Sequence, residues 1–362
     1  ISRSKPIADK PIVMEWDVFT IPYTSGTTGQ PKGVLVPHRS RILTLFGMAV
    51  EYGCYSPDDR FLAIAPMCHG AGMIFSLAPI FFGGYAEIMD QFDPERILTT
   101  FVDENISGFF GVPTHFHGIL ALEKAVLEKG SKHQLKTIIS NAAALPQQIK
   151  EQLVDQFGDG LLHETYGSTE GGIISNLRPD DQLRKQQCVG QAFPCTEIKI
   201  LNDSGKNCEA NEVGELFSTS PYLFNGYWKR FEETKEALND GWLTVGDMAR
   251  QDEEGYLYIV DRKKDMVISG GINVYPREVE EVLFKHPNVS DAAVIGIPDE
   301  KWGEAIKAYI VTTSSSEGDA EEIRSFCEQE ISKIKVPKII EFIKEIPRNA
   351  GGKVLKTELR EN

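Results

Sequence analysis

This sequence of 362 residues lacks any cysteine pair in C-x-x-C spacing and has no long apolar run. Without close pairs, the six cysteines predict neither a zinc ribbon nor a disulfide framework, and they favour a reducing, cytoplasmic setting. The longest uncharged stretch, 69–86, contains four glycines, a proline and a serine. We therefore expect buried structure around a pocket there and no integral membrane segment.

Positive charge is also scarce. The chain has 38 Lys and Arg against 53 Asp and Glu, a net charge of -15. This balance excludes a general nucleic-acid binder, although a few local cations could still bind ATP or CoA. Apolar residues make up 41% and charged residues 25%, which predicts a globular core. At roughly 150 residues per domain, we expect two or three domains.

Strand and helix signals alternate in the first half of the chain. Residues 18–24 and 106–112 read as strands, and the prolines at 94 and 146 begin helices. After residue 34, an apolar face formed by Ile42, Leu45, Phe46 and Ala49 predicts a helix. His115 and His117 are expected on opposite faces of a strand, with no third ligand for a metal. Such alternation predicts an α/β sheet with ligands at the carboxyl ends of its strands.

The pattern changes twice further along. Residues 188–261 contain short β-like runs between Gly, Asn and Asp turns, which predicts a β-rich subdomain. The remainder reads as a small α+β unit. The predicted fold class is therefore α/β, with a layered sheet-and-helix large domain over 1–261 and a small α+β domain over 265–362.

The chemistry begins at residues 24–33, which read TSGTTGQPKG. Glycines let backbone N–H groups converge on one point, the Ser and Thr residues add hydroxyl donors, and Lys32 adds a cation. That combination suits a triphosphate. The spacing is not that of a Walker A loop, because no Lys-Ser/Thr follows a glycine at the required position.

The run strongly resembles the phosphate-loop signature of the adenylate-forming, or AMP-binding, superfamily, which includes acyl- and aryl-CoA synthetases, peptide-synthetase adenylation domains and beetle luciferases. Further segments resemble the family's later signatures in order, from about Val18 to Leu359. They are ETYGSTE (164–170), GWLTVGD (241–247), DRKKDMVISGG (261–271) and PRNAGGKVLK (347–356). The form SGGINVYPREVE is typical of the acyl-CoA synthetase branch. The family's N-terminal subdomain is expected to be missing, because the chain opens at Ile1 close to the phosphate loop.

The resemblance implies roles for individual residues. Phosphates would be bound by Thr24, Ser25, Gly26, Thr27, Thr28, Gly29 and Lys32. Adenosine would be bound by Tyr166, Asp247 and Arg262. Mg²⁺ would be held by Glu170 and Thr28. Catalysis would involve Lys353, Thr169, Glu170 and His69. Val245 departs from the family, which usually has Thr at this position.

The resemblance also implies a mobile lid and an acid pocket. Lys264 falls at the hinge position, within 262–264, about which the small domain would swing between half-reactions. CoA would contact Ser269, Gly270, Gly271 and Trp302. The acyl pocket would contain His69, Gly167 and a strand formed by Asn141, Ala142 and Ala143, with Asn141 where the family usually has Gly. No obvious cation is available to pair with a second carboxylate, which argues weakly against diacids.

The function implied is activation of a small carboxylic acid by ATP, giving an acyl-adenylate and pyrophosphate, followed by transfer to the CoA thiol with release of AMP. Two alternatives stay open. One is an adenylation enzyme that loads a carrier-protein thiol. The other is a nucleotide-binding fragment that does not turn over. Neither the acid nor the oligomeric state can be read from the sequence.

Overall fold

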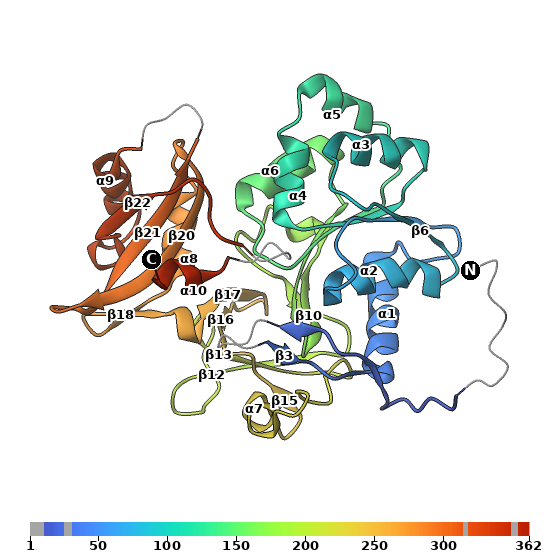
Figure 1. The fold of residues 1–362 in the computed structure, drawn as a ribbon, viewed down its shortest axis with the longest axis horizontal. Helices are drawn as coiled ribbons and strands as arrows, with labels where there is room; N and C mark the ends of the chain where they lie inside the picture. The colour runs from blue at the N-terminus through green and yellow to red at the C-terminus, as the bar shows by residue number, and fades with distance from the viewer. Residues whose placement is uncertain (1–10, 25–30, 314–317, 349–353, 362) are drawn as a thin grey trace.

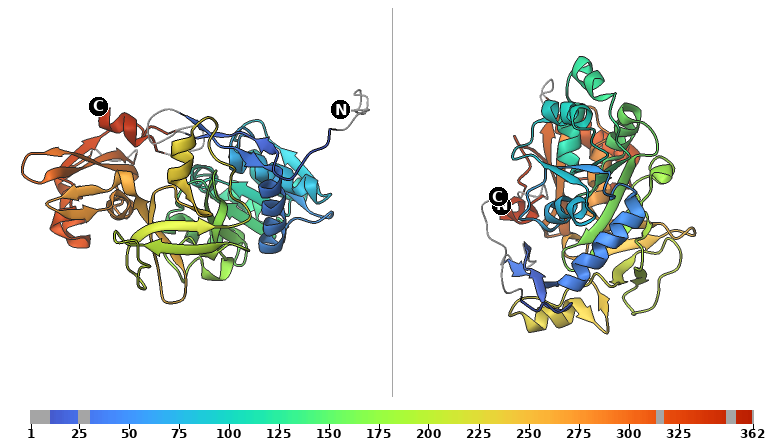
Figure 2. Two further views of the ribbon diagram at one scale, coloured as in Figure 1. Left: turned by 90° about the horizontal axis from the view of Figure 1, so that it is seen from below. Right: turned by 90° about the vertical axis from the view of Figure 1, so that its right-hand side faces the viewer.

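The computed structural model describes residues 11–24, 31–313, 318–348 and 354–361. Three main sheets follow one another along the chain, and the C-terminal sheet lies at one end of the elongated molecule (Figures 1 and 2). The α/β fold class predicted from the sequence is confirmed.

The central sheet has seven strands in the order β11-β10-β9-β8-β7-β5-β6. Its neighbours from β9 to β6 are parallel, whereas β10 and β11 are antiparallel. The strands are β5 (Arg60–Ala63), β6 (Tyr85–Ile88), β7 (Gly108–Gly111), β8 (Thr137–Ser140), β9 (Leu162–Ser168), β10 (Gly172–Leu177) and β11 (Gln191–Ala192).

Helices cover both faces of this sheet (Figure 1). Because strand side chains alternate between faces, Phe110 packs with α1 (His38–Tyr52) and α2 (Gly70–Phe81), whereas its neighbour Phe109 packs on the opposite face. The helices on that second side are α3 (Pro94–Asp103), α4 (Pro113–Leu120), α5 (Lys124–Gly130) and α6 (Gln147–Phe157). The inner strands β7 (GFFG) and β8 (TIIS) are short, fully buried and rich in apolar residues, as parallel strands in α/β proteins are.

A second, antiparallel sheet follows, and a short helix, α7 (Phe231–Ala237), lies beside it. Its strands are β12 (Glu197–Leu201), β13 (Gly214–Thr219), β14 (Leu238–Asn239), β15 (Trp242–Leu243), β16 (Asp247–Gln251) and β17 (Leu257–Arg262). Two small ribbons from the start of the chain complete this part, in which β1 (Val18–Thr20) pairs with β4 (Val36–Pro37) and β2 (Tyr23–Thr24) with β3 (Lys32–Gly33).

The C-terminal sheet has its own apolar core, separate from the two cores of the central sheet. Its strands are β18 (Val267–Ser269), β19 (Ile272–Val274), β20 (Val289–Asp299), β21 (Gly303–Thr312) and β22 (Ile339–Phe342), and its helices are α8 (Pro276–Leu283), α9 (Ala320–Glu330) and α10 (Lys356–Glu361). A separate core lets this part keep its own structure if it moves.

Two local predictions are wrong. His115 and His117 lie in α4 and not on a strand, because Pro113 occupies the first turn of a helix, where its missing N–H costs nothing. Asn141 to Ala143 form the loop after β8 and not a strand, and Ala142 has a positive φ of 76°. A positive φ does not fit an extended strand, so the chain leaves the sheet at Asn141.

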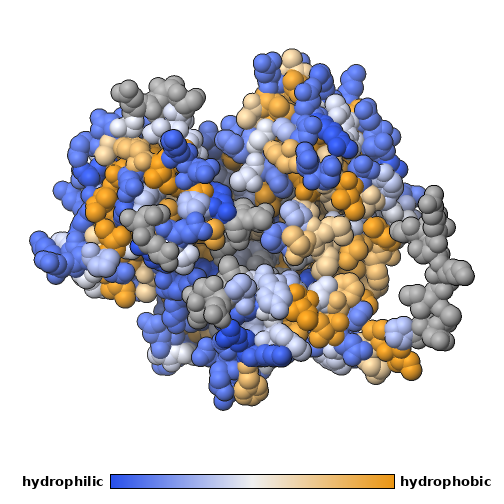
Figure 3. All heavy atoms as spheres, in the orientation of Figure 1, coloured by the Kyte–Doolittle hydropathy of each residue, from blue (hydrophilic) through white to orange (hydrophobic). Residues whose placement is uncertain are grey.

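The apolar face predicted for α1 is also partly wrong. Ile42 and Phe46 are 40% and 51% exposed, whereas Thr44 and Met48 are buried. Exposed apolar side chains gather on the outer surfaces of α1, α2 and β6, a region visible in Figure 3. Such a patch is typical of a surface that contacts another protein segment or a ligand. No helix in the described part of the chain is both long and apolar enough to cross a bilayer.

Candidate active site

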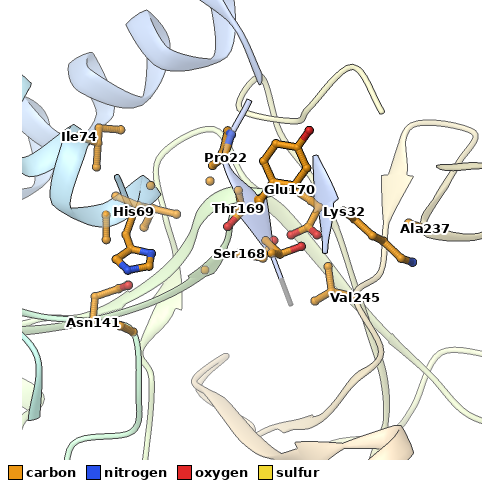
Figure 4. A pocket seen from close by; sticks show the side chains of 18 of the residues that line it. Pro22, Lys32, His69, Ile74, Asn141, Ser168, Thr169, Glu170, Ala237 and Val245 are labelled. Atoms are coloured by element: carbon orange, nitrogen blue, oxygen red, sulfur yellow. The ribbon is translucent and has the colours of Figure 1, made fainter. Parts of the chain in front are cut away.

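A cavity of about 500 Å³ opens at the carboxyl ends of the central strands. His69 follows β5 and Asn141 follows β8. Gly167 and Ser168 end β9, and Thr169 and Glu170 lie in the turn after it. This is the edge of an α/β sheet at which ligands bind. Figure 4 shows His69, Ile74 and Asn141 at one end and Lys32, Ala237 and Val245 at the other, with Ser168, Thr169 and Glu170 between them. We call these the His69 end and the Lys32 end.

Three predicted nucleotide residues contact one another beside the cavity, and of these Arg262 is the one among the lining residues. The Tyr166 hydroxyl donates to Oδ2 of Asp247 at 2.5 Å, and Arg262 Nε lies 2.9 Å from Oδ1 of the same carboxylate. Arg262 lines the cavity, and Asp247 is 5% exposed. Burial, reinforced by the charge of Asp247, raises the pKa of Tyr166, which therefore stays a hydrogen-bond donor. Residues from three separate sequence motifs thus form one connected group.

Glu170 is fixed by a residue that no motif indicated. The Tyr227 hydroxyl donates to Oε1 of Glu170 at 2.8 Å, and Glu170 is 7% exposed. Burial, with the added charge of Glu170, raises the pKa of Tyr227. Lys32 Nζ lies 4.9 Å from the centre of the Tyr227 ring, a cation–π distance. Tyr227 therefore joins the carboxylate to the cation that follows the glycine-rich loop.

The residues that flank the glycine-rich loop, Thr24 and Lys32, both lie at the cavity. Thr24 pairs with Lys32 across the β2–β3 ribbon, and both residues line the cavity. Ser25, Gly26, Thr27, Thr28 and Gly29, predicted to bind phosphates, lie outside the described residues, as does Lys353.

The polar groups of the His69 end are different. His69 is the N-cap residue of α2, makes no side-chain capping bond, and has a buried Nε2 without a hydrogen-bond partner. Asn141 points its amide away, donating through Nδ2 to both oxygens of Thr165 at 2.9 Å. Ala142 lines the cavity, but Ala143, predicted for the acyl pocket, is not among the lining residues.

Gly167 is required by the packing of the site. A Cβ at this position would lie 2.1 Å from the backbone oxygen of Gly172 on β10. No side chain fits such a distance, so only glycine lets β9 and β10 approach each other beside the cavity.

A buried ion pair supports the wall from behind. Lys150 on α6 pairs with Glu164 on β9, and their side chains are 1% and 4% exposed. Glu164 Oε1 also accepts from the Leu145 N–H at 3.0 Å, which connects β9 to the loop after β8. Glu164 is the first residue of the 164–170 motif, and the sequence gave no sign of this structural role.

Arg41 is the second residue that the sequence reasoning missed. It lies in the first turns of α1 and lines the cavity, and its Nε and Nη2 atoms are buried without hydrogen-bond partners. Its spacing of four and seven residues from the buried Leu45 and Met48 is the signal that could have placed it on the inner face.

The predicted CoA residues lie together in the C-terminal sheet, outside the cavity lining. Gly270 N–H donates to Trp302 O at 2.8 Å, and a Cβ on Gly270 would meet the indole ring at 2.6 Å. Gly270 and Gly271 have φ of 58° and 78°, values that favour glycine. Ser269 is buried, and Trp302 is 36% exposed. Lys264 is exposed in a short 3₁₀ turn (Lys263–Asp265) between the second and third sheets.

Comparison with known proteins gives a consistent result. Residues 2–228 match the AMP-binding enzyme family, and residues 278–353 match the AMP-binding enzyme C-terminal domain. The chain is 35% identical over 350 residues to the long-chain-fatty-acid–CoA ligase of Bacillus subtilis, covering 96% of this chain and 62% of that protein. It is 35% identical over 359 residues to a feruloyl-CoA synthase of an Amycolatopsis species, covering 97% and 71%.

A solved structure of a CoA synthetase is also similar to this chain. The o-succinylbenzoate–CoA synthetase of Bacillus subtilis, in complex with ATP and a magnesium ion, superposes with a TM-score of 0.86 at 28% identity, covering 98% of this chain and 72% of that one. The chain thus spans about two thirds of the length of these similar proteins.

Proposed function

This chain belongs to the AMP-binding enzyme family, and on that premise we propose that it activates a carboxylic acid with ATP and transfers the acyl group to CoA. The observation that carries the proposal is the Tyr166–Asp247–Arg262 group, which joins three signatures of the family beside one cavity. The similar proteins act by name on a fatty acid, ferulate and succinylbenzoate. They support acid–CoA ligation as the reaction and leave the acid to be found from the pocket.

In the first step, an oxygen of the acid attacks the α-phosphorus of ATP, and the bond to pyrophosphate breaks. Asp247 would accept hydrogen bonds from the ribose hydroxyls, because its carboxylate has lone pairs beyond those used by Tyr166 and Arg262. Tyr166 would stack on adenine, and Thr169, midway along the cavity in Figure 4, would bond the α-phosphate. We propose that Lys353 stabilises the negative charge that develops on the reacting oxygens, because a mobile point cation is suited to that role.

The carboxylate of Glu170 fits a magnesium ion bound with the nucleotide. It lines the cavity between the two ends, and its Oε1 is held by Tyr227. A single protein carboxylate is sufficient, since Mg²⁺ on a nucleotide takes its other ligands from phosphates and water. The described residues contain no cluster of three or more His, Cys, Asp or Glu side chains. When bound, the ion would neutralise phosphate charge.

In the second step, the CoA sulfur attacks the acyl carbon, the thiol proton is released, and the bond to AMP breaks. We propose that rotation about Lys264 brings the Gly270–Gly271 turn and Trp302 to the cavity. The separate apolar core of the C-terminal sheet supports movement of residues 265–362 as a unit. The substrates ATP and CoA also support the expected cytoplasmic location.

ATP–pyrophosphate exchange with a panel of acids tests the proposal. At least one acid should support exchange, and Lys353→Ala should abolish exchange while sparing thioester formation from a preformed acyl-adenylate. The exposed Lys344→Ala is the matched control and should retain both activities. ATP binding without exchange for any acid would reject the enzymatic proposal for this chain and favour a nucleotide-binding fragment.

A further inference from the structure

Arg41 gives the His69 end of the cavity a positive charge that nothing described in the chain neutralises. Its Nε and Nη2 atoms are buried without hydrogen-bond partners, and no ion pair joins it to a described residue. Taking a guanidinium out of water costs several kcal/mol unless an anion compensates. A half-buried guanidinium that lines a cavity and has two buried nitrogens without hydrogen-bond partners therefore indicates that its partner is a ligand.

The position of the guanidinium selects the end of the cavity. A Cβ built on Gly70 would lie 3.8 Å from Arg41 Nη2, and Gly70 is the first residue of α2, directly after His69. The three lining carboxylates belong elsewhere: Glu170 is held by Tyr227, and Glu233 and Glu236 lie on α7, where Glu233 pairs with Arg230. Arg41 thus lies at the opposite end from Lys32 and the nucleotide residues.

The surroundings of Arg41 add positive potential and supply no compensation. The uncapped N-terminus of α2, a twelve-residue helix, presents the positive end of its dipole beside the guanidinium. His69, the N-cap residue of this helix, lines the same cavity and also has a buried Nε2 without a partner. Burial lowers the pKa of Arg41 to about 10, so the group is still charged at neutral pH.

We propose that the acid activated by this chain is a dicarboxylate, whose second carboxylate pairs with Arg41 while the first reacts. This rests on the proposed function and names the substrate class for it. A guanidinium matches a carboxylate because two parallel N–H donors meet its two oxygens. Contrary to the sequence-based argument against diacids, a suitable cation is present. It was overlooked because Arg41 lies outside every recognised motif.

The test compares α,ω-dicarboxylic acids of four to ten carbons with monocarboxylic acids of the same length, using ATP–pyrophosphate exchange at saturating ATP. We expect the best dicarboxylate to exceed its monocarboxylate by at least about tenfold in kcat/KM, since a hydrogen bond to a charged group contributes roughly 1.5–3 kcal/mol. In Arg41→Met, the dicarboxylate should lose about a hundredfold while the monocarboxylate changes little. Arg41→Lys should retain part of the preference.

Arg39→Met is the matched control. Arg39 lies two residues away in α1 but pairs with Glu15 at 2.8 Å, outside the cavity lining, and its loss should leave the preference intact. Monocarboxylates that exceed dicarboxylates at every length in the unsubstituted chain would overturn the inference without any variant. Equal losses for both acids in Arg41→Met, or a raised KM for ATP alone, would assign Arg41 another role. Failure of exchange with every acid would instead reject the proposed function.

Discussion

The two ends of the cavity differ in whether their polar side chains have hydrogen-bond partners within the chain. At the Lys32 end, Tyr166, Asp247 and Arg262 satisfy one another, and Glu170 is held by Tyr227. At the His69 end, Arg41 and His69 have buried polar atoms without partners. A preorganised group needs no ligand to be stable, whereas buried unpartnered donors lower stability until something binds them. This contrast matches our proposals that the first end binds the nucleotide common to the family and the second binds the acid.

The largest expected effect comes from removing the support that both ends share. Lys150→Met leaves Glu164 as a buried, unpaired carboxylate on β9, and loss of one partner of a buried pair costs about 3–5 kcal/mol. Urea unfolding should show this loss. Adding Glu164→Gln should recover most of it, because the amide keeps the bond from Leu145 N–H without the charge.

Lys129→Met is the control for that experiment. Lys129 and Glu95 form a pair whose side chains are 56% and 55% exposed, and such a pair contributes only about 0–1 kcal/mol. A loss in Lys150→Met no larger than in this control would show that the wall does not depend on the buried pair.

The second prediction concerns a substitution that disrupts the Tyr166–Asp247–Arg262 group and leaves the His69 end intact. Asp247→Asn keeps the shape but removes the charge shared by Tyr166 and Arg262. We expect kcat/KM for ATP to fall by about 10²–10³, since hydrogen bonds to a charged group contribute roughly 1.5–3 kcal/mol each. The KM for the acid should change little. Asp252→Asn, in an ion pair with Lys185 away from the cavity, is the control. A change confined to the acid would contradict the division between the two ends.

The same division explains what could be predicted from sequence. Tyr166, Asp247 and Arg262 belong to segments whose order resembles a family, so they could be assigned to one predicted nucleotide site although they lie far apart in the chain. Their mutual contacts were not predicted, because they depend on how β9, β16 and β17 meet in space. The alternation of strands and helices was likewise sufficient for the fold class.

The His69 end was not readable, for physical reasons. Whether α1 turns Ile42 or Arg41 inward depends on what packs against the helix, and helical spacing alone allowed either choice. Small side chains decide the question: Ser40 and Thr44 are buried, so the helix lies close to its neighbours with Arg41 turned inward. Tyr227 escaped notice for a similar reason, since a tyrosine outside any motif gives no signal until Glu170 is seen beside it.

A smaller effect, on the Mg²⁺ dependence, should follow from removing the hydrogen bond that orients Glu170. Tyr227→Phe removes the hydroxyl that holds Oε1, and loss of a residue that orients a metal ligand weakens metal affinity by about 10–100-fold. The half-saturating Mg²⁺ concentration for exchange should rise accordingly, while acid preference stays the same. Tyr258→Phe removes a hydroxyl bonded to Asp252, away from the cavity, and should leave the Mg²⁺ dependence unchanged. An unchanged dependence in Tyr227→Phe would argue against magnesium at Glu170.

The smallest expected effect is a pH dependence of the unfolding free energy through His163, a buried group that already has a protein partner. His163 on β9 is buried, its Nδ1 lies 2.9 Å from Asn176 Nδ2, and it is not part of the cavity lining. Burial lowers the pKa of His163 from 6.5 to about 4. Below pH 6.5 the unfolded chain binds a proton that the folded chain refuses, so this contribution is complete above pH 6.5 and is lost as the pH falls toward 4.

Lowering the pH from 7 to 5 should therefore cost about 1–2 kcal/mol of unfolding free energy through His163. His163→Gln should reduce that pH dependence, while the exposed His117→Gln should behave as the unsubstituted chain. Because His163 already has a protein partner, the difference between these variants should persist in the presence of saturating ATP or acid. Arg41 has no such partner, so binding of its anion should raise stability in the unsubstituted chain and not in Arg41→Met. If the His163 contribution to the pH dependence disappeared when the substrate acid was added, this histidine would be connected to the ligand. The distinction between buried groups with a protein partner and those without one would then fail.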